Sequence, residues 1–224
     1  MANIITRRKV LELRQKGLSY SQIKKEMKIN QSTLSMWLRD YPLNPEQLEN
    51  LNKNDAKSER FRITMKAKKD ALLHKYCKNA KGLLLPLTNK ELFIAGLFLY
   101  WGEGSKTRNG LLSISNTNPA FMQFSLLWMR EALHIPKNKI TVLLHIYSDM
   151  DKTEMVSYWS NVLRIPESQF SKPYIKESKK ISLDYKGYGH GTCMLRVCNT
   201  YIAENVLMSI KAFDEYSKLR INEL

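Results

Sequence analysis

Apolar residues recur at helical spacing in three short segments at the start of the chain. Gly17 follows the first segment, Ser19 precedes the second and Asn30 precedes the third, and these residue types commonly end or cap helices. The apolar positions are Val10, Leu11, Leu13, Ile23, Met27, Leu34, Trp37 and Leu38. The pattern predicts three short helices, with a tight turn between the second and the third.

A fourth helical segment follows Pro42 and Pro45, which interrupt the pattern. From Lys53 to Lys81 the chain carries ten lysines and arginines against three acids. Its apolar positions form only a thin stripe, consisting of Phe61, Met65, Leu72 and Tyr76. We expect a basic linker helix that Gly82 to Pro86 bring to an end.

From residue 91 onward, helical and strand patterns alternate. The Asn109-Gly110 pair predicts a tight turn, and Asn116 to Pro119 supply a helix cap with a proline in the first turn. The predicted helices are 91–101, 119–133, 151–163 and 201–219, and the predicted strands are 111–115, 139–147 and 192–199. This order predicts an α+β class, with helices on one curved sheet. The predicted domains are residues 1–42, a linker 43–90 and residues 91–224.

The net charge of +15 points to a polyanionic partner. Residues 1–90 hold 20 basic and eight acidic side chains, whereas residues 91–224 hold 16 and 13. This asymmetry favours nucleic acid as the partner of residues 1–90. The alternative is a basic surface that only keeps the protein soluble.

Other classes of protein are disfavoured by composition. Cys77, Cys193 and Cys198 are odd in number and lack zinc-ligand spacing, which argues against a disulfide scaffold and a structural metal. The apolar run from 91 to 104 is too short for a membrane span, and the N-terminus lacks the pattern of a signal peptide. We expect a cytoplasmic protein without a membrane partner, nucleoid-associated if it is prokaryotic.

The stretch from Gly17 to Leu38 resembles the helix-turn-helix of resolvase-like and transposase-like DNA-binding domains. Lys24 stands where that family prefers a small residue, and Lys28 where it prefers a glycine in the turn. The resemblance implies that the third helix enters the major groove of double-stranded DNA. The side chains expected to contact DNA are Gln31, Ser32, Ser35 and, nearer a phosphate, Arg39. The alternative is a three-helix packing unit that reads no groove.

A second resemblance rests on the sequence FLYWGEGS at residues 98–105. This motif, at the end of a buried helix and before a short hairpin, resembles the motif of LAGLIDADG homing endonucleases. The order of elements over residues 91–220 is similar to that family's αββαββα fold, with an inserted helix near 151–163. In the family, the motif helices of two repeats pack together; here Ala95 and Gly96 are the small residues that could serve this crossing.

The resemblance implies a metal-dependent nuclease site at Glu103. The acid of the family motif binds the divalent cation that cuts DNA, and one motif per chain implies a homodimer with one Glu103 from each subunit. The cofactor would be Mg²⁺ or Mn²⁺, and Lys106 and Arg108 would act on phosphate or the transition state. In the alternative interpretation, Glu103 is bonded to backbone or paired with Lys106, and the two cations are solvated.

A basic stretch inside the 165–191 segment is a further candidate for DNA contact. Lys172, Lys176, Lys179 and Lys180 lie there with interleaved tyrosines, a composition that suits a nucleic-acid backbone. A solvated loop explains the same residues equally well.

The leading hypothesis is therefore a sequence-specific DNA-binding protein that acts as a metal-dependent double-strand endonuclease. One alternative is a transcription regulator with the same architecture that binds without cleaving. Another is an assembly factor that bridges proteins, for which DNA affinity would depend only weakly on salt.

Overall fold

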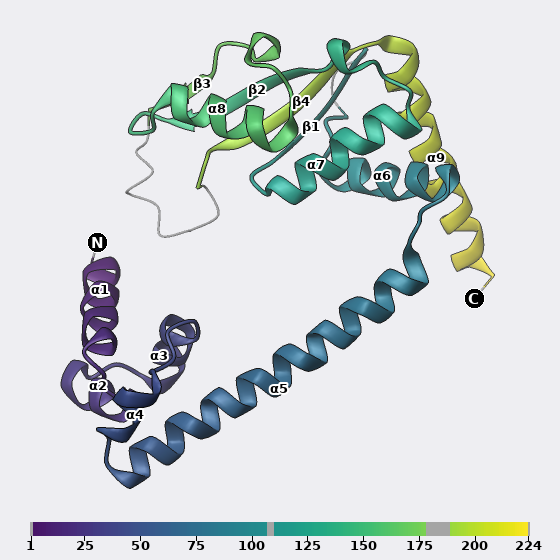
Figure 1. Cartoon of the computed structure of the whole chain (residues 1–224). Coiled ribbons are helices and arrows are strands. Elements are labelled where there is room, and N and C mark those ends of the chain that lie inside the picture. Colours follow the sequence, from purple (N-terminus) through teal and green to yellow (C-terminus); the bar gives the residue numbers. More distant parts are fainter. Residues whose placement is uncertain (1, 107–109, 178–188, 224) are drawn as a thin grey trace. The chain divides into compact units, whose positions relative to one another are not determined.

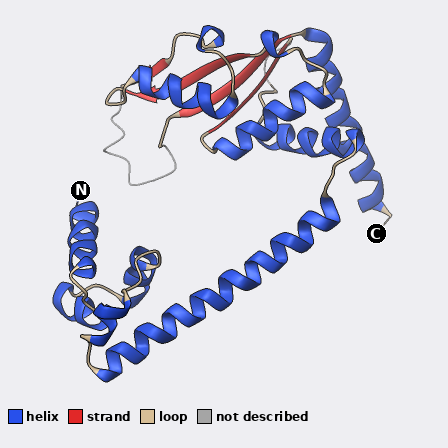
Figure 2. Ribbon diagram, viewed as in Figure 1, coloured by secondary structure: helices blue, strands red, loops and turns tan. Residues whose placement is uncertain are grey.

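The computed structural model describes residues 2–106, 110–177 and 189–223. The chain divides into two compact units, one ending at Leu85 and the other beginning at Pro86 (Figure 1). The class is mixed α+β, as predicted, and the described strands all belong to the second unit (Figure 2).

The first unit is helical. Its helices are α1 (Ala2–Gln15), α2 (Tyr20–Met27), α3 (Gln31–Leu38), α4 (Pro45–Glu49) and α5 (Lys53–Leu84). The three helices expected before residue 40 are all present, and α1 begins earlier than its apolar pattern indicated.

The ends of α1 and α2 follow from local chemistry. Gly17 adopts a φ of +91°, the left-handed conformation that glycine provides after a helix. Ser19 and Gln22 form a capping box at the start of α2, which confirms the predicted cap. Asn30 occupies the cap position of α3 without a side-chain hydrogen bond to the helix. Lys28 ends α2 with a φ of +52°, so a lysine takes a conformation that favours glycine.

A small apolar core joins α1, α2 and α3. Its buried members are Val10, Tyr20, Ile23, Leu34, Trp37 and Leu38. The apolar positions predicted on α3 are thus all buried, as are Val10 and Ile23. Burying a side chain of this size contributes roughly 1.5–3 kcal/mol, so these few residues stabilise the unit substantially.

The α5 helix extends past its predicted end. Gly82 lies inside the helix, and the last helical residue is Leu84. The helix stops because Leu85 precedes Pro86, and a residue before proline is driven to extended backbone; Leu85 has a ψ of 146°. Of the described side chains of α5, only Ala56 and Glu59 are buried.

The second unit combines one sheet with four α-helices among the described residues. Its elements are α6 (Asn89–Glu103), β1 (Leu111–Asn116), α7 (Pro119–Leu127), β2 (Thr141–Tyr147), α8 (Lys152–Leu163), β3 (Tyr174–Lys176), β4 (Thr192–Cys198) and α9 (Thr200–Asn222). The helix predicted to reach Leu133 changes to a π-helical turn at Trp128–Ala132. The strand predicted from residue 139 begins at Thr141, because Lys137–Lys139 form a 3₁₀ turn.

The sheet has the order β1-β4-β2-β3. The first two pairings are antiparallel and the β2–β3 pairing is parallel. Before β1, Gly104 forms a bridge to Ile114, and the Ser105 N–H donates to the Ser113 carbonyl at 2.9 Å. These contacts place the end of α6 beside β1, where a short hairpin was expected.

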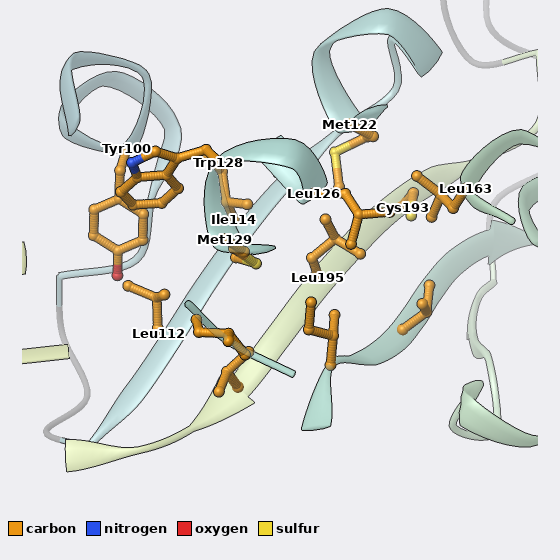
Figure 3. Packing of buried hydrophobic residues seen from close by; sticks show 14 of the residues in the cluster. Tyr100, Leu112, Ile114, Met122, Leu126, Trp128, Met129, Leu163, Cys193 and Leu195 are labelled. Carbon is orange, nitrogen blue, oxygen red and sulfur yellow. The ribbon is translucent and has the colours of Figure 1, made fainter. Parts of the chain in front are cut away.

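One face of the sheet carries the hydrophobic core, against α6, α7, α8 and α9 (Figure 1). The strand residues on this face are Leu112, Ile114, Val142, Leu144, Ile146, Cys193, Leu195 and Val197. Figure 3 shows part of this packing, including the Trp128 indole beside the Tyr100 ring, with ring centroids 6.0 Å apart.

Gly96 brings α6 and the π-helical turn into close contact. A Cβ at this position would lie 2.0 Å from the Trp128 indole, so the packing requires glycine. The expectation that Gly96 could serve a crossing with a second motif helix is therefore wrong, because this residue is buried inside its own unit. Ala95, by contrast, is only partly buried.

Among the described residues, no single helix is both long and apolar enough to cross a membrane. The consecutive helices α5 and α6 reach the required length and hydropathy only when they are taken together.

Candidate nucleic-acid interface

The α3 helix has one buried side and one exposed side. Leu34, Trp37 and Leu38 form the buried side, because they pack against α1 and α2. All four side chains predicted to contact DNA are exposed: Gln31, Ser32 and Ser35 on the helix, and Arg39 at its C-terminal end. Helical spacing thus presents amide, hydroxyl and guanidinium groups to solvent, and such groups bond to base edges and phosphates.

A buried ion pair connects α1 with α5. Arg14 Nη2 and Glu59 Oε2 are 2.8 Å apart, and their side chains are only 4% and 2% exposed. The other oxygen of Glu59 accepts a bond from the Tyr20 backbone N–H, which is in the first turn of α2. Arg14 also donates to the carbonyls of Tyr41 and Leu18. The start of α5 is thereby fixed to the three-helix core.

Sequence reasoning missed this ion pair. Arg14 follows Val10 by four residues, which puts it on the buried side of α1, but a single arginine at the end of an apolar face gives little signal. Glu59 is one acid in a strongly basic helix, and nothing local marks it as buried.

Glu103 is the last residue of α6 and is exposed. Its neighbour Gly102 has open space where a Cβ would lie, whereas a Cβ on Gly104 would collide with the Tyr100 ring. Lys106 donates to the carbonyl of Gly104 at 3.1 Å, which places its ammonium on this turn. The carboxylate and the ammonium predicted to act on phosphate thus come from one short segment.

Glu103 offers one exposed carboxylate to a divalent cation. No group of three or more His, Cys, Asp or Glu side chains that could hold a metal occurs within residues 2–106, 110–177 and 189–223. Mg²⁺ is commonly held by one or two carboxylates together with water and substrate phosphates. The exposed Glu103 carboxylate fits such a site if DNA, or Glu103 of a second copy, supplies further oxygen ligands.

The remaining predicted residues are only partly within the described regions. Lys172 is exposed just before β3. Arg108, Lys179 and Lys180 lie outside the described residues.

The second face of the sheet is a polar surface that sequence reasoning did not identify. Successive strand residues point to opposite faces, so the residues alternating with the core residues share this face. Its polar residues include Ser113 and Ser115 of β1, Thr192 and Arg196 of β4, Thr141 and His145 of β2, and Tyr174 of β3. The apolar residues Leu111, Leu143 and Met194 share this face, and Ser113 is buried. The signal was available, because the same period-two pattern that predicted the strands also defines their second face.

Arg196 occupies the middle of this face. It lies between Ser113 and Thr141 in the strand register. One guanidinium nitrogen donates to the Ser171 hydroxyl at 2.7 Å, while Nε is buried without a hydrogen-bond partner among the described residues. Arg196 is partly buried, and an incompletely satisfied guanidinium at such a position suits an anionic ligand.

The pKa of His145 reflects the positive charge of the same face. Burial lowers the pKa of its imidazole below the ordinary 6.5, and the nearby charges of Lys176 and Arg196 lower it further. The Tyr174 ring lies 5.3 Å from the imidazole, centroid to centroid. At neutral pH this face therefore presents fixed cations and a neutral histidine.

No protein-family model matches this sequence, and no curated protein and no solved structure is significantly similar to it.

Proposed function

We propose that this protein binds double-stranded DNA sequence-specifically, with α3 as the recognition helix of a helix-turn-helix. The observation that carries the proposal is the division of α3 into a buried apolar side and an exposed side that bears Gln31, Ser32 and Ser35. These side chains are short and polar, as base-edge contacts require, and Arg39 at the helix end suits a phosphate.

The turn before α3 gives independent support. In the helix-turn-helix domains that this segment resembles, the turn position held here by Lys28 prefers glycine. Lys28 has a φ of +52°, the backbone conformation that explains such a preference. At this one position the backbone thus adopts a conformation that favours glycine, although the residue is lysine.

The polar face of the sheet offers a second DNA-contacting surface. Arg196 and Lys176 supply positive charge there, and serine and threonine hydroxyls supply hydrogen-bonding groups. The order of elements from α6 to α9 supports the resemblance to a LAGLIDADG domain, in which the second unit would act as a homodimer on DNA.

The test of recognition compares specific with nonspecific binding. A target duplex is first selected from a random-sequence pool by the full-length protein. Replacing Gln31 and Ser35 by alanine should weaken binding to that target by tenfold or more, since each lost base contact costs about 1–3 kcal/mol. Binding to unrelated duplex should change far less.

A matched control is Gln15→Ala, which removes an exposed glutamine of α1. It should leave both affinities unchanged. Equal loss of specific and nonspecific binding in the Gln31 and Ser35 variant would refute the assignment of α3.

Metal-dependent DNA cleavage is the second candidate function. The exposed Glu103 carboxylate, next to the unobstructed Gly102, favours it over binding alone. Glu103 from each of two subunits would hold Mg²⁺ or Mn²⁺, and the bound cation would activate water for attack on a phosphodiester. Lys106 would contribute positive charge beside the reacting phosphate.

Cleavage is tested on a random-sequence plasmid library with Mg²⁺ or Mn²⁺, with Glu103→Gln as the isosteric variant. Cuts at a recurring site that disappear in the variant would establish the nuclease. Binding without cuts, unchanged by the substitution, would instead make the protein a regulator of transcription.

A further inference from the structure

A groove lies beside the C-terminal end of α3, between this helix and α5. Its volume is about 490 Å³. Ser35 and Arg39, two of the side chains proposed to contact DNA, line the groove from the α3 side. From the α5 side it is lined by Arg62, Lys66 and Lys69, with apolar contributions from Met65 and Leu73.

The charges around this groove are predominantly positive. Five cations line it, Arg14 among them, and the acids that line it are Glu59 and Asp70. Glu59 is neutralised by Arg14 at 2.8 Å, and Lys66 is paired with Asp40 at 3.0 Å. The remaining charges that line the groove are the cations Arg39, Arg62 and Lys69 and the acid Asp70. Charge complementarity therefore favours an anionic occupant.

The α5 cations are held in fixed register with α3. Glu59, one turn before Ile63, ties α5 to α1 and α2 through buried hydrogen bonds. Lys66 Nζ donates to the Arg39 carbonyl at 2.9 Å and contacts Asp40 at 3.0 Å, which links α5 directly to the end of α3. The Arg62 guanidinium lies 4.4 Å from the centre of the Tyr20 ring. Lys66 and Arg62 are thereby preorganised, and preorganised cations lose little conformational entropy on binding.

Ser35 and Arg39 both line the groove and belong to the proposed DNA-binding side of α3, so DNA is the expected occupant. A strand of DNA whose bases contact Gln31 and Ser32 would have its phosphates close to the end of α3, where Ser35 and Arg39 open into the groove. Phosphates pair well with lysine and arginine, and the apolar carbons of deoxyribose suit the Met65 and Leu73 side chains.

We infer that the first half of α5 belongs to the DNA-binding surface, with Arg62, Lys66 and Lys69 holding the phosphate backbone beside the bases that α3 contacts. This inference rests on the proposed DNA binding. The sequence alone indicated a basic linker helix with a side that would suit a phosphate backbone. The groove adds which cations of α5 make that contact and places them beside α3.

Adjacent lysines provide the test. Lys68 and Lys69 are both exposed, but they project roughly 100° apart around the helix, and only Lys69 lines the groove. Lys68→Gln and Lys69→Gln therefore remove the same charge from the same helix on different faces. The measurement is the affinity of the full chain for a short random-sequence DNA duplex over a series of salt concentrations.

Loss of one phosphate contact should reduce the slope of log K against log salt by about 0.9. We expect the Lys69→Gln variant to show this reduction in slope. The double variant Lys66→Gln/Lys69→Gln should show a reduction about twice as large. The control variants Lys68→Gln, and Lys68→Gln with Lys75→Gln, should keep the parent slope. Because Lys66 also bonds to α3, the single Lys69 variant decides the question if the double variant loses stability.

The outcomes separate this inference from the proposed function. Equal slopes for the Lys68 and Lys69 variants would overturn the groove assignment while leaving DNA binding intact. Competition by polyglutamate as strong as that by duplex DNA would overturn it too, because the groove would then accept an acidic polypeptide. A parent protein whose binding does not depend on salt would refute the proposed DNA binding itself.

Discussion

The Glu59 carboxylate accepts a 2.8 Å bond from the Arg14 guanidinium, although the two residues are 45 positions apart and both side chains are almost completely buried. The second carboxylate oxygen bonds to the Tyr20 N–H at 2.9 Å. A single side chain of α5 thus satisfies polar groups from two other helices, and the position of α5 beside α3 depends on it.

Removing Glu59 should strongly destabilise the first unit. Glu59→Ala leaves the Arg14 charge buried without its partner, which typically costs about 3–5 kcal/mol. The free energy of unfolding, measured by urea titration of the full chain, should fall by this amount in the transition of the first unit. Glu49→Ala, an exposed acid at the end of α4, should change it by less than about 0.5 kcal/mol.

A double substitution checks the mechanism. Arg14→Met combined with Glu59→Leu removes both charges, so much of the lost stability should return. If the double variant is as unstable as the sum of the two single variants, the charge pair does not explain the effect.

Replacing Lys28 by glycine should stabilise the turn between α2 and α3. The φ of +52° costs an L residue about 1 kcal/mol, which glycine avoids, although glycine also gains entropy in the unfolded chain. We expect a gain of up to about 1 kcal/mol in thermal or urea unfolding. Lys25→Gly, inside α2, is the control and should lose about 0.8–1 kcal/mol. A loss of stability in both variants would contradict the assigned turn geometry.

Gly96 and Gly102 belong to the same helix but should respond oppositely to alanine. A methyl group on Gly96 would lie 2.0 Å from the Trp128 indole, whereas no atom lies within 4 Å of the corresponding position on Gly102. Gly96→Ala should therefore cost about 1–3 kcal/mol or more through overpacking. Gly102→Ala should be neutral or slightly stabilising, because alanine is the better helix former. Urea unfolding of the second unit measures both, and equal effects would argue against the packing of Trp128 on α6.

Most secondary structure could be predicted from the sequence because its signals are local. The cap at Ser19, the stop at Gly17 and the start of α7 at Asn118 and Pro119 follow from residue chemistry within one helical turn. The end of α5 was misplaced because the glycine at 82 suggested an earlier stop, while the constraint imposed by Pro86 determined the end.

The sites depend on contacts that local patterns do not contain. Exposure of Gln31 and Ser35 followed from helical periodicity, but the partnership of Arg14 with Glu59 joins residues 45 positions apart. Arg196 became a candidate only once strand pairing placed it between Ser113 and Thr141. The role of Gly96 was misjudged because its neighbour, Trp128, comes from a different element.

His145 provides a pH-dependent test of the polar face of the sheet. Because its pKa lies below the ordinary 6.5 in the folded protein, the unfolded chain takes up this proton at higher pH than the folded chain does. The associated stability is fully present above pH 6.5 and is lost as the pH falls through the lower folded pKa. As the pH falls, the free energy of unfolding of the His145→Gln variant should therefore decrease less than that of the parent protein.

DNA contact should shift the same pKa upward. A phosphate near Arg196 and Lys176 would offset the positive charge that now disfavours the imidazolium. NMR titration of the His145 ring should therefore give a pKa below 6.5 for the free protein and a higher value with bound duplex. An unchanged His145 pKa in saturating DNA would exclude this face from the interface and leave α3 and the α5 groove as the proposed DNA contacts.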